Sequence, residues 1–189
     1  WWGGTNGVAK RRPADAADPA DPAYDWSAYD RLVVNAEKAG VSVLLTILGT
    51  PAWANGGRGW NRMPTDVEDF SGFVRAASTR YDGTHPDADG TLLPAVRRWM
   101  VWNEPNNPVF LRPQFDWSGG KWVIRSARDY ALLCNAAVAG IRAAQGTAAR
   151  IACGGTAPRG NNAPRSSRPS VSPLPFLTAM RAAGARGLG

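Results

Sequence analysis

The sequence predicts an α/β fold with a parallel sheet, and more narrowly part of an eight-stranded (β/α)8 barrel. Helical and strand patterns alternate along most of the chain, which is typical of parallel sheets. No glycine-rich phosphate-binding motif follows a predicted strand, so a nucleotide-binding fold has no support. The segments after the strands are long and rich in Trp, Asn and Pro, whereas those before them are plainer. A barrel whose site lies at the carboxyl ends of its strands has this asymmetry.

The first predicted helix follows an irregular stretch over residues 1–25, in which Ala-Asp-Pro repeats favour turns. A helix is expected over residues 27–39, because Ser27 and Asp30 resemble a capping box and apolar residues recur at helical spacing. The apolar run over residues 41–48 then predicts a strand that is buried on both faces.

The same unit of a helix followed by a strand is expected twice more. Thr65 and Glu68 form a capping box at the start of a second helix, and a strand is expected over residues 97–102. A third helix over 126–145 precedes a strand over 151–154.

A last short helix is expected over residues 172–184. Ser172 suits its cap, and Pro173 suits its first helical position.

Composition limits the function classes. The chain has 189 residues, 44% of them hydrophobic, which is enough for one domain with a packed core. No apolar run reaches the length of a membrane span. The net charge is +7, but the arginines are scattered and form no continuous stripe that could follow a phosphate backbone. We therefore interpret the charge as a basic surface and expect no nucleic-acid partner.

Two cysteines and one histidine carry little chemistry of their own. Cys134 and Cys153 have no zinc-site spacing. Two buried free thiols are the interpretation we favour, and a disulfide between neighbouring elements is the alternative. His85 is the only histidine, so these residues alone supply no metal site with two His ligands. We expect neither a metal nor a cofactor.

The segment Trp102-Asn103-Glu104-Pro105-Asn106 ends the strand over residues 97–102 and resembles a motif of clan A glycoside hydrolases, with the closest likeness to the cellulase-like families 5 and 39. The segments Asp25-Trp26-Ser27-x-x-Asp30 and Leu45-Thr46-x-x-Gly49-Thr50-Pro51-x-Trp53 carry the same resemblance. In that clan the Asn-Glu pair ends the fourth strand of the barrel.

This mapping implies that the chain runs from the end of strand two to helix five. Residues 1–189 would then be part of a single catalytic domain, truncated at both ends, because a complete barrel has about 250 residues. The family's nucleophile is a Glu at the end of strand seven, which lies outside this chain. The resemblance also implies an extracellular or secreted protein.

The resemblance assigns candidate roles to five residues. Glu104 would be the catalytic acid/base, and Asn103 would hydrogen-bond the sugar's 2-hydroxyl. Trp53, Trp60 and Trp102 would bind substrate, because a flat indole face matches the C–H face of a pyranose. Simpler readings stay open, since Glu104 is otherwise a solvated charge, Asn103 a turn residue, and each Trp a packing residue.

The expected function is that of a retaining glycoside hydrolase, which cleaves O-glycosyl bonds of an oligo- or polysaccharide with two carboxyl groups. The chain carries one of the two, so it is expected to be inactive by itself. The alternative is a non-catalytic carbohydrate-binding barrel, and the two differ by the Glu at the end of strand seven in the parent protein.

Overall fold

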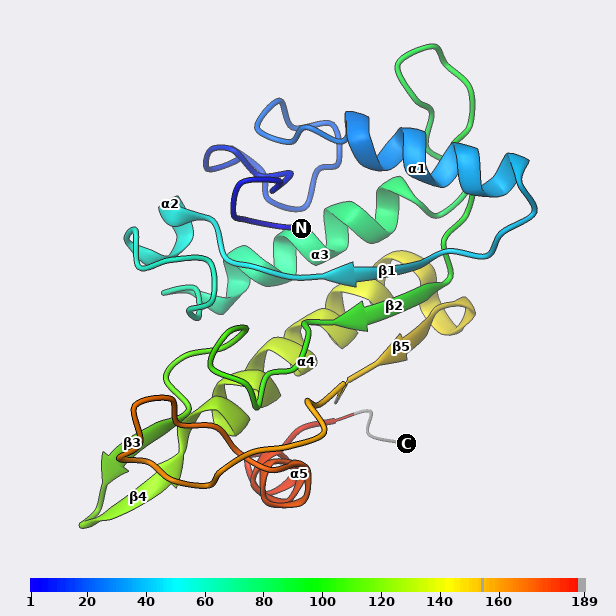
Figure 1. Cartoon of the computed structure of the whole chain (residues 1–189). Helices are drawn as coiled ribbons and strands as arrows, with labels where there is room; N and C mark the ends of the chain where they lie inside the picture. The colour runs from blue at the N-terminus through cyan, green and yellow to red at the C-terminus, as the bar shows by residue number, and fades with distance from the viewer. Residues whose placement is uncertain (154, 187–189) are drawn as a thin grey trace.

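The computed structural model describes residues 1–153 and 155–186. Its centre is a three-stranded parallel sheet in the order β1-β2-β5, shown in Figure 1. The bounds are β1 Leu44–Ile47, β2 Arg98–Val101 and β5 Arg150–Ala152. The predicted parallel sheet is therefore present. Within the described residues it is an open sheet of three strands and not a closed barrel.

Helices alternate with these strands in the predicted order. Their bounds are α1 Ser27–Lys38, α2 Ala52–Asn55, α3 Val67–Arg80, α4 Arg125–Gln145 and α5 Pro173–Ala182, with a 3-10 turn over Gly146–Ala148. A hairpin of β3 Phe115–Ser118 and β4 Lys121–Ile124 precedes α4. The sequence predicted neither this hairpin nor α2. Residue 154, the last of its expected strand, lies outside the described residues.

Two helix starts differ from the predicted capping boxes. The Asp25 carboxylate accepts hydrogen bonds from the backbone N–H and the hydroxyl of Ser27 at the start of α1. At α3 the Asp66 carboxylate accepts from the Glu68 N–H at 2.9 Å, and Thr65 is not the cap. In both cases an aspartate two residues before the N–H forms the tighter local turn.

Asp30 has a tertiary role instead of a capping role. Its carboxylate accepts two hydrogen bonds from the Arg80 guanidinium, at 2.9 and 2.7 Å, and one from the Tyr81 hydroxyl at 2.9 Å. The Arg80 guanidinium also lies 5.7 Å from the ring centre of Trp26. This cluster joins α1 to the end of α3.

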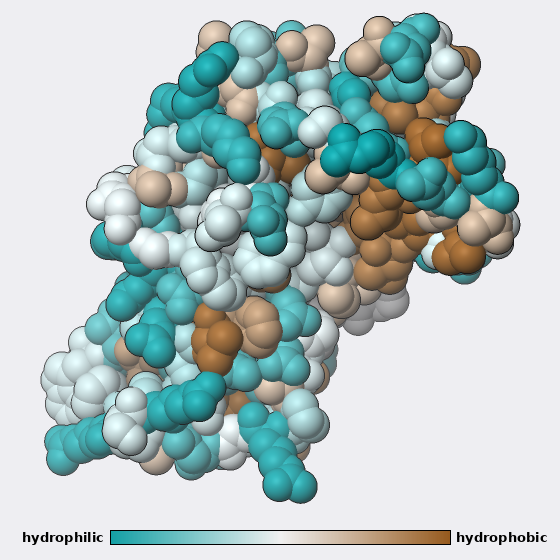
Figure 2. All heavy atoms as spheres, turned by 45° about the horizontal axis from the view of Figure 1, so that its top comes forward, coloured by the Kyte–Doolittle hydropathy of each residue, from teal (hydrophilic) through white to brown (hydrophobic). Residues whose placement is uncertain are grey.

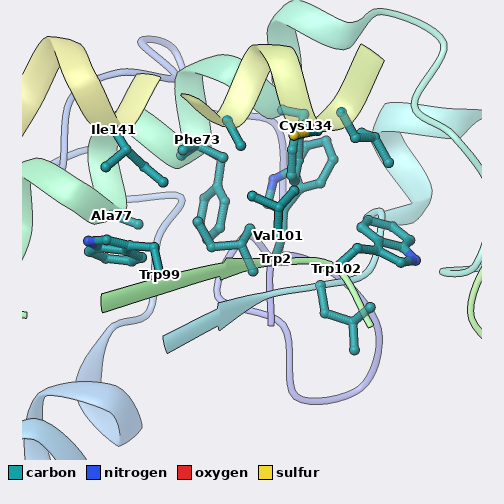
Figure 3. Close-up of a cluster of buried hydrophobic side chains, with 14 of the residues drawn as sticks. Trp2, Phe73, Ala77, Trp99, Val101, Trp102, Cys134 and Ile141 are labelled. Carbon is teal, nitrogen blue, oxygen red and sulfur yellow. The ribbon is translucent and has the colours of Figure 1, made fainter. Parts of the chain in front are cut away.

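The core lies between one face of the sheet and the helices α3 and α4 (Figure 3). Trp99 and Val101 of β2 are each 1% exposed, so both are core residues. The two helices approach closely at Gly140, where an added Cβ would lie 3.0 Å from the Ser71 carbonyl oxygen. A side chain at this position would push the helices apart.

Within the described residues, the opposite face of the sheet stays partly open to solvent. Its side chains form two rows across paired strand positions, Leu44-Arg98-Arg150 and Thr46-Met100-Ala152, which are exposed or half-buried. Figure 2 shows an apolar patch on the side of the molecule where α1 and the beginning of β1 lie. Val41 and Leu44 are 59% and 50% exposed there.

Cys134 and Cys153 form a disulfide, which corrects the favoured reading of two free thiols. Cys134 lies on the buried face of α4, and Cys153 directly follows β5. Their Cα atoms are 6.1 Å apart, within the usual range for a disulfide.

The first residues lie beside β1. The Trp2 and Gly3 N–H groups donate to the carbonyls of Leu48 and Gly49, at 2.8 and 3.1 Å. Among the described helices, none has the length and apolar character needed to cross a bilayer.

Candidate functional site

The segments after β1 and β2, and the described residues that follow β5, meet at the carboxyl edge of the sheet. The Trp102 N–H donates to the Ile47 carbonyl at 2.8 Å, and the Glu104 N–H donates to the Gly155 carbonyl at 2.9 Å. Glu104 therefore lies where the end of β2 meets the segment that follows β5. Active sites of (β/α) proteins lie at this edge.

The backbone around Glu104 is strained. Trp102 and Glu104 have φ angles of 61° and 39°, in the left-handed region that residues with a Cβ seldom adopt. Each such residue costs about 1–3 kcal/mol and persists only where its surroundings hold it in place. Strained backbone of this kind clusters at functional sites. Here it includes the backbone of Glu104, the predicted catalytic residue.

The Glu104 carboxyl is half-buried and has a defined partner. Its Oε2 accepts a hydrogen bond from Asn107 Nδ2 at 2.9 Å, while the Asn107 backbone N–H donates to the Glu104 carbonyl at the same distance. The carboxyl and its backbone are thus both held by one residue, three positions along the chain. Asn107 was not a predicted site residue, and its signal was the Asn-rich loop after Glu104.

Asn103 and Asn106 differ in environment. Asn103 is half-buried, and no described residue hydrogen-bonds its side-chain amide. Asn106 is fully buried. Its Nδ2 donates to the carbonyls of Ala157 and Val171 at 3.0 and 2.7 Å, and its Oδ1 accepts from the Ala157 N–H at 2.7 Å. Asn106 therefore joins the loop after β2 to the segments after β5.

Trp102 does not fit its expected role in substrate binding. Its side chain is 0% exposed, and its indole N–H donates to the Phe110 carbonyl at 2.7 Å. The edge of Phe70 packs against it, with ring centres 6.3 Å apart. The ring has no face open to a sugar, and Trp102 instead anchors the loop that carries Glu104.

Trp53 and Trp60 are both half-buried and line one surface pocket of about 590 Å³. The Arg12 guanidinium lies 4.6 Å from the centre of the Trp53 ring. The edge of Trp60 contacts Phe110 of the loop after Glu104, with ring centres 6.1 Å apart. Glu104 does not line this pocket. The structure therefore groups the two tryptophans with each other, and Trp60 contacts Phe110 of the loop that follows Glu104.

The two acidic residues that follow Glu104 in the sequence are both bound to Arg125. Its Nε donates to Asp129 at 2.6 Å, and its Nη1 donates to Asp116 at 3.3 Å. Burial raises the pKa of Asp129, and the hydrogen bond from Arg125 partly offsets this rise. Both carboxylates therefore belong to a local ion-pair network at the start of α4.

No cluster of three or more His, Cys, Asp or Glu side chains in the described ranges is arranged to hold a metal ion.

Comparison with known proteins gives a fold-level likeness. No known family profile matches the chain, and no curated protein matches it in sequence. A crystal structure of a glucosidase from Croceicoccus marinus is similar, with a TM-score of 0.56 and 17% identity over 79% of this chain. The chain spans 26% of the length of that structure. The shared feature is the mixed α/β fold.

Proposed function

We propose that this chain is part of a (β/α)8 glycoside hydrolase domain and carries the catalytic acid/base, Glu104. The observation that carries the proposal is the position of Glu104. It lies at the carboxyl edge of a parallel sheet, on strained backbone, with its carboxyl half-buried and oriented by Asn107. The fold-level likeness to a glucosidase supports the same class.

In the proposed reaction Glu104 gives its proton to the glycosidic oxygen as the bond to the sugar breaks. A second carboxylate, on the other side of the sugar, forms the covalent intermediate of a retaining enzyme. Asp116 and Asp129 are unsuited to this second role, because both are bound to Arg125. The proposal therefore assigns the nucleophile to a part of the parent protein outside this chain.

Two further groups would bind the substrate. The Asn103 amide has no hydrogen-bond partner among the described residues, so it is available to the sugar's 2-hydroxyl. The pocket that Trp53 and Trp60 line is large enough for sugar units next to the cleaved bond. The proposed substrate is therefore an oligo- or polysaccharide. The disulfide is compatible with an extracellular protein, because such bonds persist in oxidising compartments.

A second candidate is a carbohydrate-binding barrel without catalysis. It is favoured by one observation, the separation of the Trp53 and Trp60 pocket from Glu104. A parent protein without a carboxylate opposite Glu104 would bind sugars in that pocket and cleave none.

The test uses the natural gene product that contains this chain. Hydrolysis of a panel of aryl glycosides is compared for the wild type, Glu104→Gln and the control Glu37→Gln, whose side chain is exposed on α1. The enzyme proposal expects that only Glu104→Gln abolishes turnover of glycosides with poor leaving groups, such as simple phenols, which need a proton donor. Turnover of these glycosides that Glu104→Gln leaves intact would refute the catalytic role, and sugar binding with no turnover at all would select the second candidate.

A further inference from the structure

The disulfide joins α4 to the segment that holds the backbone of Glu104. Cys153 is two residues before Gly155, whose carbonyl accepts the Glu104 N–H at 2.9 Å. Ala157, two residues further on, exchanges two hydrogen bonds with Asn106. The loop after β2 and the described residues after β5 are thus joined on both sides of Glu104, and the disulfide lies at the start of this joined region.

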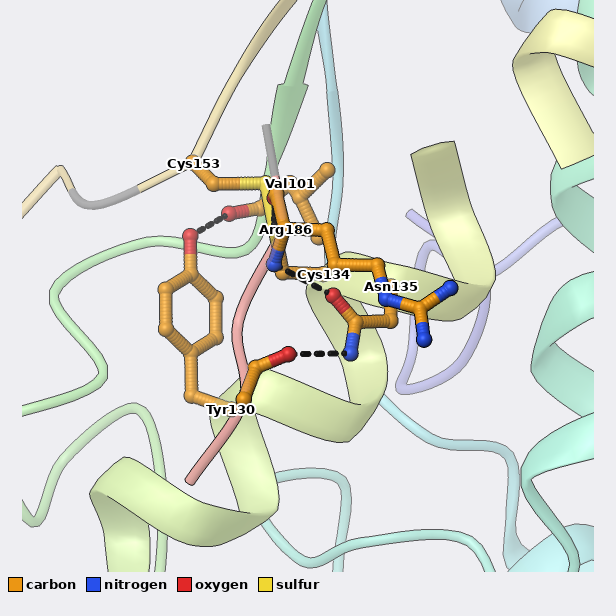
Figure 4. Close-up of a disulfide and its surroundings, with 7 residues drawn as sticks. Val101, Tyr130, Cys134, Asn135, Cys153 and Arg186 are labelled. Atoms are coloured by element: carbon orange, nitrogen blue, oxygen red, sulfur yellow. Dashed lines mark hydrogen bonds between the residues drawn. A yellow bond between two sulfur atoms is a disulfide. The ribbon is translucent and has the colours of Figure 1, made fainter. Parts of the chain in front are cut away.

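The same helix also holds the end of β2. The Tyr130 hydroxyl donates to the Val101 carbonyl at 2.6 Å, directly before the strained residue Trp102. Tyr130 and Cys134 are four residues apart on α4, so they lie on one face of the helix. Figure 4 shows both contacts side by side. One face of α4 therefore contacts Val101, shortly before Glu104. Through Cys134 the same face is linked to Cys153, at the start of the segment that hydrogen-bonds to the Glu104 backbone.

The strained backbone at Trp102 and Glu104 needs support from the segments around it. The positive φ angles of Trp102 and Glu104 are unfavourable in isolation. They persist only while the surrounding contacts fix both sides of the loop. The Glu104 N–H bond to Gly155 is one of these contacts, and the position of Gly155 depends on where the chain leaves Cys153.

The Cys134 end of the disulfide is covered by protein, whereas Cys153 is half-buried. Cys134 is 0% exposed, and its Sγ contacts the Arg186 carbonyl at 3.8 Å. Asn135 holds the same segment, since its Nδ2 donates to the Gly184 carbonyl and its Oδ1 accepts the Arg186 N–H, at 3.0 and 2.8 Å. The cross-link is therefore packed against protein on its α4 side and accessible enough at Cys153 to be reduced.

We propose that the Cys134–Cys153 disulfide, together with Tyr130, is a positioning device for Glu104. This inference rests on the proposed function, in which the position of the Glu104 carboxyl matters. The cross-link keeps the segment after β5 in place, and that segment keeps the strained Glu104 backbone in its catalytic conformation. Loss of the cross-link then disturbs Glu104 first and the rest of the fold less.

The test compares the gene product that contains this chain with its Cys134→Ala/Cys153→Ala variant, both labelled with 15N and 13C at glutamate. The glutamates of this chain are Glu37, Glu68 and Glu104, and a Glu→Gln variant of each assigns its signal. We expect the Glu104 signals to shift or broaden, and its amide to exchange about tenfold faster or more. The signals of the exposed Glu37 and Glu68 should stay in place.

The matched control is Leu133→Ala. Leu133 is fully buried on α4 beside Cys134, so its truncation weakens the same helix but keeps the cross-link. The control should leave the Glu104 signals at their wild-type positions. Tyr130→Phe removes the second contact and should shift the Glu104 signals as the cysteine variant does.

An unchanged Glu104 signal in the cysteine variant, or the same change in Leu133→Ala, would overturn the proposal. If the double variant does not fold, wild-type protein in its oxidised form and after phosphine reduction gives the same comparison with the same two outcomes. The readout needs no turnover. A Glu104 signal that depends on the cross-link, in a gene product that cleaves no glycoside, would therefore refute the proposed function and leave the tether established.

Discussion

Glu104 and Asn107 hold each other in a closed local unit, with one hydrogen bond between their side chains and one from the Asn107 N–H to the Glu104 carbonyl, both 2.9 Å long. The side-chain bond fixes the direction of the carboxyl group. The backbone bond fixes the turn on which that carboxyl sits. Asn107 thus acts on Glu104 through both its side chain and its main chain.

Asn107→Ala removes the side-chain donor, together with the bond that Asn107 Oδ1 accepts from the Val109 N–H. It keeps the Asn107 N–H that donates to the Glu104 carbonyl. We expect kcat of the parent enzyme to fall up to about tenfold, because the carboxyl loses the hydrogen bond that fixes its direction and such a bond contributes about 0.5–1.5 kcal/mol. Steady-state kinetics on an aryl glycoside measure it, with the thermal midpoint as a check on folding. An unchanged kcat would show that Asn107 does not orient the catalytic carboxyl.

Trp60→Ala removes an aromatic wall of the pocket. We expect KM for an oligosaccharide to rise about tenfold, as the loss of one buried apolar contact implies, with a smaller effect on a short aryl glycoside. The matched control is Trp122→Ala, whose ring is 40% exposed on the β3–β4 hairpin and packs on Trp117 instead. Equal effects of the two substitutions on oligosaccharide KM would contradict a sugar site at Trp60.

Asp30→Ala leaves the Arg80 guanidinium without its carboxylate. The Arg80 side chain is only 10% exposed, and removal of one partner of such a pair costs about 3 kcal/mol or more. Chemical denaturation measures the loss of unfolding free energy. The double variant Asp30→Ala/Arg80→Leu should recover part of it, because no unpaired charge then remains. A double variant no more stable than Asp30→Ala alone would argue that the ion pair is not the cause.

Asp21 makes the N-terminal loop sensitive to acid. Its carboxylate accepts hydrogen bonds from the N–H groups of Ala23, Asp15 and Ala14, at 2.8, 3.0 and 2.8 Å. These bonds, that from Ala23 most of all, hold the pKa of Asp21 below its ordinary value of 3.8. A carboxyl with a lowered folded-state pKa stabilises the protein above its unfolded-state value and loses this effect as the pH falls through the folded-state value.

The thermal midpoints of the wild type and Asp21→Asn should therefore differ most near neutral pH. We expect the difference to shrink as the pH falls below about 4, where the unfolded-state carboxyl takes up its proton. Thermal melts across the acidic range measure this difference. A gap that stays constant down to the lowest pH would mean that the Asp21 charge contributes nothing to the loop.

Much of the architecture could be predicted because the order of the elements follows from periodicity. The three strands and the helices over 27–39, 126–145 and 172–184 all have structural counterparts within a few residues of the expected bounds. The caps were wrong because Asp25 and Asp66 compete for the same N–H groups. Spacing alone does not decide between such neighbours.

From the sequence we did not predict the β3–β4 hairpin, and we favoured free thiols over the disulfide. Gly119 and Gly120 have φ angles of 59° and 75°, and a Gly-Gly pair between strand-forming residues is a known hairpin signal. This signal could have been found. The disulfide was the alternative to two free thiols, and the sequence could not decide between them because the answer depends on how α4 lies against the end of β5. The burial of Trp102 likewise depends on tertiary packing.

The central claim is that Glu104 protonates the glycosidic oxygen. It is tested most directly by how the cleavage rate of Glu104→Gln depends on the leaving group. The parent enzyme and this variant are compared on aryl glycosides whose leaving groups range from dinitrophenol to simple phenols. A proton donor matters most for poor leaving groups. We predict that the variant loses little rate of glycosidic bond cleavage with dinitrophenol and several orders of magnitude with phenol. An equal loss across the series would contradict the assignment of Glu104 as the acid that protonates the glycosidic oxygen.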